Sequence, residues 1–155
     1  MALGALAYNA MESVMHEHDS YIATAVSMFG LFDAVLLDQN DYEGYAYIKM
    51  ISALRQSERD GFHPRGCASP ESVVYHEIGH MLDYLCNLSQ NAEMKAYVAS
   101  LSSREVLDGV SQYATVSMQE LIAEAFAEYT CNPSPRKIAR FIGGFIDTEY
   151  MKIPK

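Results

Sequence analysis

The segment SPESVVYHEIGHMLDYL, residues 69–85, carries the clearest structural pattern in this chain. Ser69 followed by Pro70 is typical of a helix start, because serine is a common N-cap and proline fits the first helical position. The segment predicts a helix that runs to about Leu88. The helix is expected to be largely buried, because apolar residues recur along it: Val73, Val74, Ile78, Met81, Leu82 and Leu85.

An HExxH motif, His76-Glu77-Ile78-Gly79-His80, lies inside this helix. Residues four apart share a helix face, so His76 and His80 can bind one zinc ion. Glu77 lies beside them, where its carboxylate can take a proton from a zinc-bound water. The alternative is a solvated stripe of polar residues. The buried surroundings favour the zinc site, because buried histidines and carboxylates need partners.

A catalytic zinc ion usually has a third protein ligand, which must come from elsewhere in the chain. The HExxHxxGxxH class is excluded, because Asp83 occupies the glycine position and Cys86 the last histidine position. The other histidines are poor candidates. His16 and His18 are expected to point to different helix faces, and His63 is interpreted as an exposed or packed residue of a loop.

A later predicted helix, residues 118–131 with Ser117 as its N-cap, offers a better third ligand. It contains Glu120, Glu124 and Glu128, each four apart. Alanines flank the first two and permit close helix packing, so we assign Glu120 as the ligand and Glu124 as the support of a ligand histidine. Spacing alone leaves the reverse assignment open. Glu128 is interpreted as part of a solvated face.

The rest of the chain predicts an α+β domain, mostly helical with a small mixed or antiparallel sheet and with HExxH on a central helix. Residues 103–116 carry no clear pattern, and Gly143-Gly144 is a weak point in the last helix. The expected elements are a helix at 5–29, strands at 32–38 and 45–51, a loop at 55–68, and helices at about 91–102 and 135–150.

Composition excludes several classes of protein. The 155 residues carry a net charge of −9, which argues against partners such as nucleic acid or an anionic membrane. Half of the residues are hydrophobic, so the chain is not a disordered acidic tail. There is no apolar stretch long enough to span a bilayer. Three widely spaced cysteines suit a reduced, cytoplasmic setting.

The motifs resemble gluzincin peptidases, and in detail the catalytic domain of the anthrax lethal factor-like peptidases. HEIGHMLD matches that family's HExxH with an Asp three residues on, and Tyr113 precedes an ELIAEAF segment that begins at Glu120. The resemblance implies that His76, His80 and Glu120 bind one Zn²⁺ and that Glu77 is the general base. It further implies that Tyr113 donates a hydrogen bond to the oxyanion, and that Asp83 and Glu124 support the ligands.

Residues 60–140 also resemble zincin-like domains of bacteriophage minor head proteins. That resemblance implies a single domain over residues 1–155 that belongs to a longer phage or prophage polypeptide, with a virion-associated location and a phage structural partner. In zincins an edge strand binds extended peptide, a role that residues 45–51 could fill; the open alternative is an ordinary core strand.

The expected function is therefore a zinc metallopeptidase that acts on a peptide or protein substrate. Two alternatives stay open. One is a zinc-binding structural or assembly module of a phage head protein, in which the metal holds helices together. The other is a regulator-cleaving protease similar to ImmA/IrrE, which also has an ExxAxxFA helix.

Overall fold

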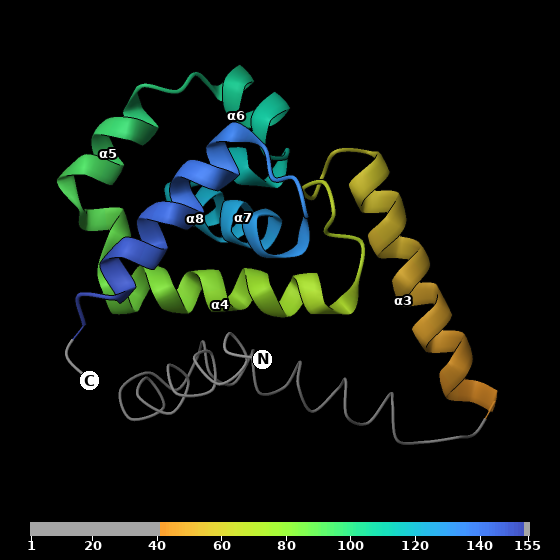
Figure 1. The fold of residues 1–155 in the computed structure, drawn as a ribbon. Helices are drawn as coiled ribbons and strands as arrows, with labels where there is room; N and C mark the ends of the chain where they lie inside the picture. Colours follow the sequence, from red (N-terminus) through yellow and green to blue (C-terminus); the bar gives the residue numbers. More distant parts are fainter. Residues whose placement is uncertain (1–40, 154–155) are drawn as a thin grey trace.

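The structure is a computed structural model that describes residues 41–153, and within this range every regular element is a helix. The chain order is shown in Figure 1. The elements are α3 (Asp41–Arg59), α4 (Pro70–Cys86), the 3₁₀ turn η1 (Leu88–Gln90), α5 (Ala92–Ala99), α6 (Ser103–Gly109), the 3₁₀ turn η2 (Tyr113–Thr115), α7 (Met118–Cys131) and α8 (Lys137–Tyr150).

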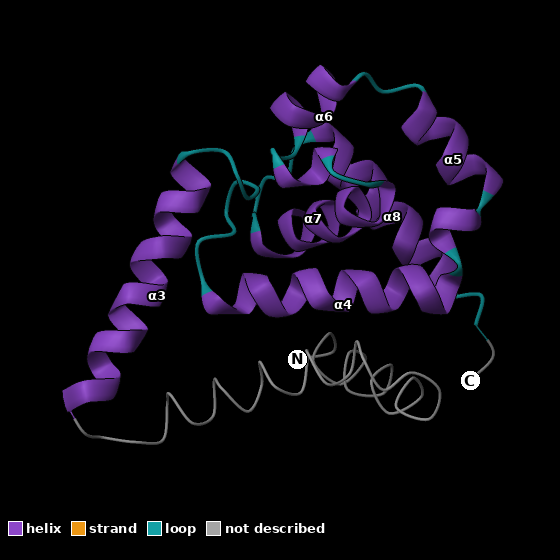
Figure 2. Ribbon diagram, turned by 180° about the vertical axis from the view of Figure 1, so that it is seen from behind, coloured by secondary structure: helices purple, strands orange, loops and turns teal. Residues whose placement is uncertain are grey.

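The prediction of an α+β fold with a small sheet is wrong for the part of the chain that the structure describes. Figure 2 shows helices and loops there and no strand. The predicted strand at 45–51 lies inside α3, and so it is not a substrate-binding edge strand. Its tyrosines and isoleucines favour strands only where a neighbouring strand pairs with them. The helix formers that follow at 53–58 continue the helix instead. The predictions for 5–29 and 32–38 lie outside the described residues.

The two helices that carry the motifs are confirmed. Ser69 holds the extended N-cap position of α4, and Pro70 begins the helix. The Ser117 side chain accepts a hydrogen bond from the backbone N–H of Glu120 at 3.1 Å and so caps α7. The uncertain stretch 103–116 contains α6 and η2, and a capping box between Ser102 and Glu105 begins α6.

Helices α4 and α7 cross in close contact, with α8 and α5 against the same core (Figure 1). The contact is closest where Gly79 of α4 meets Ala123 of α7. A Cβ atom built on Gly79 would lie only 2.7 Å from Ala123 Cα and 3.3 Å from Ala123 Cβ. Only glycine fits this crossing, so the glycine inside the motif sets the distance between the two helices.

Gly143 allows a similarly close approach between α7 and α8. A Cβ there would lie 2.1 Å from Tyr129 Cγ, because the tyrosine ring covers the glycine. The helix nevertheless continues unbroken past Gly143-Gly144 to Tyr150. The position predicted as a weak point is therefore a packing contact.

Glu128 is fully buried, so its interpretation as part of a solvated face is wrong. Its carboxylate accepts hydrogen bonds from Arg136 Nε at 2.9 Å and Nη2 at 2.6 Å, and from the Arg136 backbone N–H at 2.9 Å. The guanidinium also donates to the backbone carbonyls of Asp108 and Val110. This ion pair joins the end of α7 to the start of α8 and to the segment after α6.

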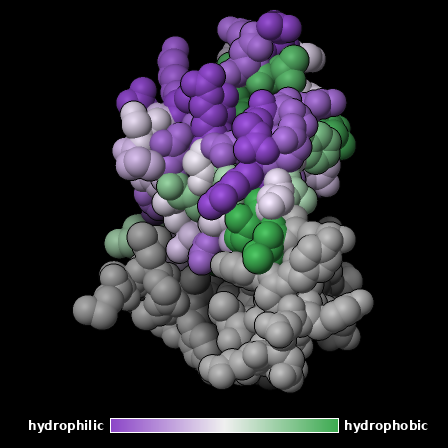
Figure 3. All heavy atoms as spheres, turned by 90° about the vertical axis from the view of Figure 1, so that its right-hand side faces the viewer, coloured by the Kyte–Doolittle hydropathy of each residue, from purple (hydrophilic) through white to green (hydrophobic). Residues whose placement is uncertain are grey.

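The C-terminal half of α3 lies beside the loop at 60–69. The Glu58 carboxylate accepts a hydrogen bond from the backbone N–H of Gly66 at 2.7 Å and so holds the helix to this loop. Its outer side is polar, and Gln56 bonds both Asp60 and Arg59 there. Figure 3, which views the molecule from the α3 side, shows mainly hydrophilic side chains among the described residues, with apolar ones in smaller patches. This half of α3 therefore presents a solvated face.

A search of the described helices for a membrane span found none with the length and apolar character that crossing a bilayer requires.

We expect Gly79→Ala to destabilise the protein by about 1–3 kcal/mol, because the added methyl group forces α4 and α7 apart. Gly144→Ala is the matched control, since a Cβ there meets nothing within 4 Å. It should stabilise α8 by about 0.5–1 kcal/mol, because glycine is the poorer helix former. Urea unfolding measures both, and equal effects of the two changes would contradict the assigned contact.

We expect Arg136→Met to cost about 3–5 kcal/mol, because it leaves the buried Glu128 carboxylate without its partner. Lys137→Met, at the exposed neighbouring position, should change the free energy of unfolding by less than about 0.5 kcal/mol. Urea unfolding at neutral pH compares the two. Similar small effects would show that the ion pair contributes little.

Candidate metal centre

The α4–α7 crossing brings two pairs of polar side chains together. His76 and His80 lie three residues before and one residue after Gly79, and Glu120 and Glu124 lie in the same positions around Ala123. Residues four apart lie on one helix face. Each pair therefore straddles the point of closest contact, and both pairs face the same space between the helices.

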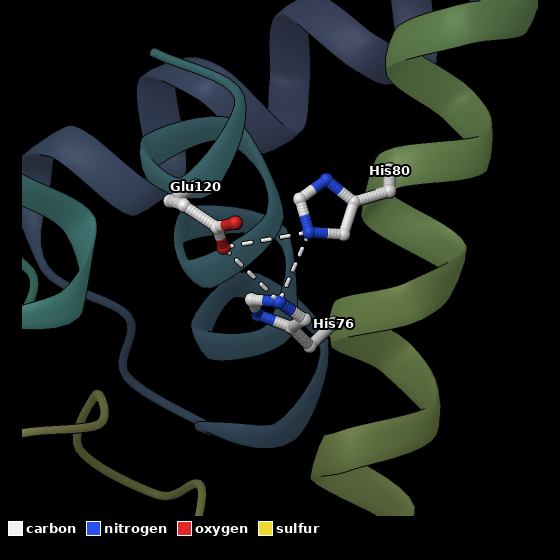
Figure 4. Close-up of side chains that lie close together, drawn as sticks. All are labelled: His76, His80 and Glu120. Atoms are coloured by element: carbon white, nitrogen blue, oxygen red, sulfur yellow. Dashed lines mark hydrogen bonds and ion pairs between the residues drawn. The ribbon is translucent and has the colours of Figure 1, made fainter. Parts of the chain in front are cut away.

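Three donor atoms meet there, as Figure 4 shows. His76 Nε2 lies 3.1 Å from His80 Nε2, and Glu120 Oε2 lies 3.3 Å from the first and 3.4 Å from the second. Around a tetrahedral zinc ion with bonds of about 2.0–2.1 Å, neighbouring donor atoms lie about 3.3–3.4 Å apart. The three atoms therefore match three corners of such a tetrahedron without any movement of the backbone.

The donor set also fits zinc chemically. Glu120 Oε2 is buried and has no hydrogen-bond partner, which is costly for a carboxylate oxygen unless a cation is close. Two imidazoles and one carboxylate form a common ligand set of catalytic zinc sites, and such sites keep a fourth position for water or substrate. The residues present therefore fit the ion that the sequence predicts.

Glu124 lies behind His76 and orients its ring. Glu124 Oε1 is 2.8 Å from His76 Nδ1, although the N–H bond is not aligned with the oxygen as a good hydrogen bond requires. This short distance implies that the ring proton lies on Nδ1 and that Nε2 faces the other donor atoms with its lone pair. Glu124 is itself buried and is held by Ser111 Oγ at 2.7 Å and His63 Nδ1 at 3.2 Å.

The surroundings shift the pKa values of the histidines in opposite directions. Burial disfavours the protonated form of His76, but the Glu124 carboxylate, with Glu77 and Glu120, outweighs this and raises its pKa. Burial and the neighbouring His76 lower the pKa of His80. Burial opposes ionisation of Glu124, yet the contacts with His63 and His76 and the hydrogen bond from Ser111 hold its pKa below the usual value. Glu124 is therefore an anionic acceptor at neutral pH, and His80 is a neutral donor of a lone pair.

Tyr113 and Glu77 lie at the same centre. The Tyr113 ring stacks on His76, with ring centroids 5.9 Å apart. Burial raises the pKa of Tyr113, as do the neighbouring carboxylates of Glu120, Glu124 and Glu77, so its hydroxyl keeps its proton at neutral pH. Tyr113 and Glu77 both line a cavity of about 370 Å³. Its apolar walls come from Leu54, Phe62, Pro64, Val73 and Ala127.

The structure thus brings together every predicted site residue except Asp83. The Asp83 carboxylate is buried, and it accepts a hydrogen bond from the backbone N–H of Ser89 at 2.6 Å, beyond the C-terminus of α4. Asp83 affects His80 only through its charge, which acts to raise the pKa of the His80 ring.

Two residues of the site were missed by the sequence reasoning. His63 is half-buried and contacts Glu124, and Ser111 donates to the same carboxylate. Backbone hydrogen bonds from Gln112 N to Gly61 O at 2.8 Å and from Tyr113 N to Phe62 O at 3.1 Å join their two segments. These contacts link segments about 50 residues apart, so no local spacing in the sequence could have shown them. His16 and His18 lie outside the described residues.

Comparisons with protein-family models, with curated proteins and with solved structures found no significant match to this chain.

We expect the purified protein to bind one zinc ion per chain, and the two carboxylates to differ in their effect on affinity. Glu124→Gln should weaken binding roughly 10–100-fold, the range for a residue that supports a ligand. Glu120→Gln should weaken it further, because it removes a ligand. Competition with a chromophoric chelator measures the affinities, and elemental analysis measures the stoichiometry.

Glu93→Gln is the control, because Glu93 is exposed on α5. Circular dichroism establishes that each variant is folded. A larger loss of affinity for Glu124→Gln than for Glu120→Gln would reverse the assignment of the third ligand, and no zinc in the wild type would refute the site.

Proposed function

We propose that this chain is a zinc-dependent metallopeptidase of the gluzincin type, with His76, His80 and Glu120 as ligands and a peptide or protein as substrate. The observation that carries the proposal is the triangle of three donor atoms within 3.4 Å of one another, one of them a buried carboxylate oxygen without a partner. The likeness of HEIGHMLD and ELIAEAF to the lethal factor-like and phage zincin-like domains supports the same function.

Glu77 is the residue that moves the proton. When bound, zinc supplies a Lewis acid that polarises the substrate carbonyl and lowers the pKa of a water molecule. Glu77 directly follows His76 in α4 and lines the same cavity. In the proposed reaction its carboxylate accepts a proton from the attacking water and delivers it to the nitrogen of the leaving amine.

Tyr113 and the cavity act on the substrate. The protonated Tyr113 hydroxyl donates a hydrogen bond to the oxygen of the attacked carbonyl as negative charge develops on it. The cavity has mostly apolar walls, and its volume of about 370 Å³ lies at the lower end of the range of ligand pockets. The proposal keeps the cytoplasmic setting that the three widely spaced cysteines predict.

We expect Glu77→Gln to keep zinc bound and to lower the rate of peptide cleavage roughly 10²–10⁴-fold, because the amide cannot accept a proton. Cleavage is measured on a broad peptide library, with each variant loaded with one equivalent of zinc. Glu71→Gln is the matched control, because this exposed glutamate lies on the same helix, six residues from Glu77.

The outcomes separate the proposed functions. Loss of cleavage in Glu77→Gln alone supports the peptidase. A wild-type protein that binds zinc and cleaves no peptide contradicts it and favours an assembly module, in which the metal only joins α4 to α7. Cleavage confined to a helix-turn-helix repressor favours a regulator-cleaving protease.

A further inference from the structure

Two thiols that are 64 residues apart in the sequence lie in contact beside the candidate metal centre. Cys67 is in the loop that precedes α4 and is 4% exposed. Cys131 is the last residue of α7 and is half-buried. The two thiols lie close enough for each to shift the pKa of the other, and Cys67 also lines the cavity that holds Glu77 and His63.

The backbones on both sides of this thiol pair also touch. A Cβ atom built on Gly66 would lie 3.1 Å from Asn132 Cα, so these two main chains are in direct contact. Asn132 Nδ2 donates to the Arg65 carbonyl at 3.3 Å. Gly66 and Asn132 are the chain neighbours of Cys67 and Cys131, so their contact holds the two cysteines on adjacent stretches of main chain, and a disulfide needs such closeness.

We propose that Cys67 and Cys131 form a reversible disulfide bond by exchange with a low-molecular-weight disulfide such as oxidised glutathione. The Cys131 thiolate attacks one sulfur of glutathione disulfide and releases one glutathione, which takes up a proton. Cys67 then loses its proton and attacks the Cys131 sulfur of the mixed disulfide, which releases the second glutathione. The two cysteines are oxidised, and glutathione disulfide is reduced to two thiols.

The environments of the two thiols support this order of attack. The contact with Cys67 lowers the pKa of Cys131, although burial opposes this. The same contact and burial raise the pKa of Cys67. The thiolate is the nucleophile in exchange, so the more accessible Cys131 reacts first and the buried Cys67 resolves the mixed disulfide. Burial raises the pKa of Cys86 to about 11, so Cys86 is a poorer attacking thiol than Cys131.

The bond would fix one wall of the site. The loop at 60–69 carries His63, whose ring contacts Glu124 of α7, and the disulfide would join this loop covalently to the end of α7. Closing so long a loop restricts the unfolded chain. We therefore expect oxidation to raise the Tm by roughly 5 °C or more.

The test is peptide mapping of the full chain after incubation with glutathione disulfide. A protease that cuts after glutamate places the three cysteines in separate peptides, residues 59–71, 78–93 and 129–149. We expect a linked pair of the first and third peptides, a fall from three free thiols to one, and full reversal by dithiothreitol. Calorimetry compares the Tm of the two forms.

Cys86→Ser should leave the linkage unchanged, whereas Cys131→Ser should abolish it. The proposal would be overturned if the wild-type protein kept three free thiols after incubation. It would also be overturned if glutathione stayed on Cys131 without a Cys67–Cys131 bond, or if a disulfide to Cys86 formed instead. A crosslinked form with an unchanged or lower Tm would overturn the assigned effect on the loop. None of these outcomes depends on zinc binding or on peptide cleavage.

Discussion

The contact between Gly79 and Ala123 is the constraint on which the rest of this structure depends. The absence of a side chain at Gly79 lets α4 and α7 approach until a Cβ would overlap the opposite backbone. His76 and His80 lie three residues before and one residue after Gly79, and Glu120 lies three residues before Ala123. Side chains at these positions face the crossing, so this one contact brings His76 and His80 within 3.4 Å of Glu120. A wider crossing would separate the histidines from the carboxylate, and the donor atoms could no longer share one ion. The small residues at the crossing therefore serve the geometry of the site as much as the packing of the core.

Helix α7 carries two buried carboxylates, Glu124 and Glu128, and each is stabilised by a different set of partners. Glu128 is paired with Arg136 through two side-chain nitrogens, and it is part of the joint between α7 and α8. Glu124 has no arginine or lysine beside it among the described residues; it is held by Ser111, His63 and His76. Glu120 differs from both, because its inner oxygen has no hydrogen-bond partner. Three glutamates with identical spacing thus have three distinct environments, and of the three only Glu120 has a buried oxygen without a hydrogen-bond partner.

The sequence sufficed where the deciding interaction is local. An N-cap serine, a proline at the first turn and the four-residue spacing of histidines and glutamates are all properties of a single helix, and the structure confirms α4 and α7. Local reasoning could also have located α6, since Ser102 and Glu105 form a capping box with the expected spacing. It failed where the interaction is distant. Residues 45–51 look like a strand only if a partner strand is assumed, and the burial of Glu128 depends on Arg136 in the next element.

The loss of the expected strand changes how a peptide could be recognised at this site. An edge strand would bind the substrate backbone through a row of amide hydrogen bonds, and the described residues offer no such row beside the histidines. What they offer is a cavity whose walls come from α3, the loop at 60–69, α4 and α7. Those walls are mostly apolar, and their polar groups include Glu77 and Tyr113. In the proposed peptidase this cavity would take the place of the edge strand as the surface that contacts substrate. Its α3 wall is the part of the site that departs most from the sequence-based expectation.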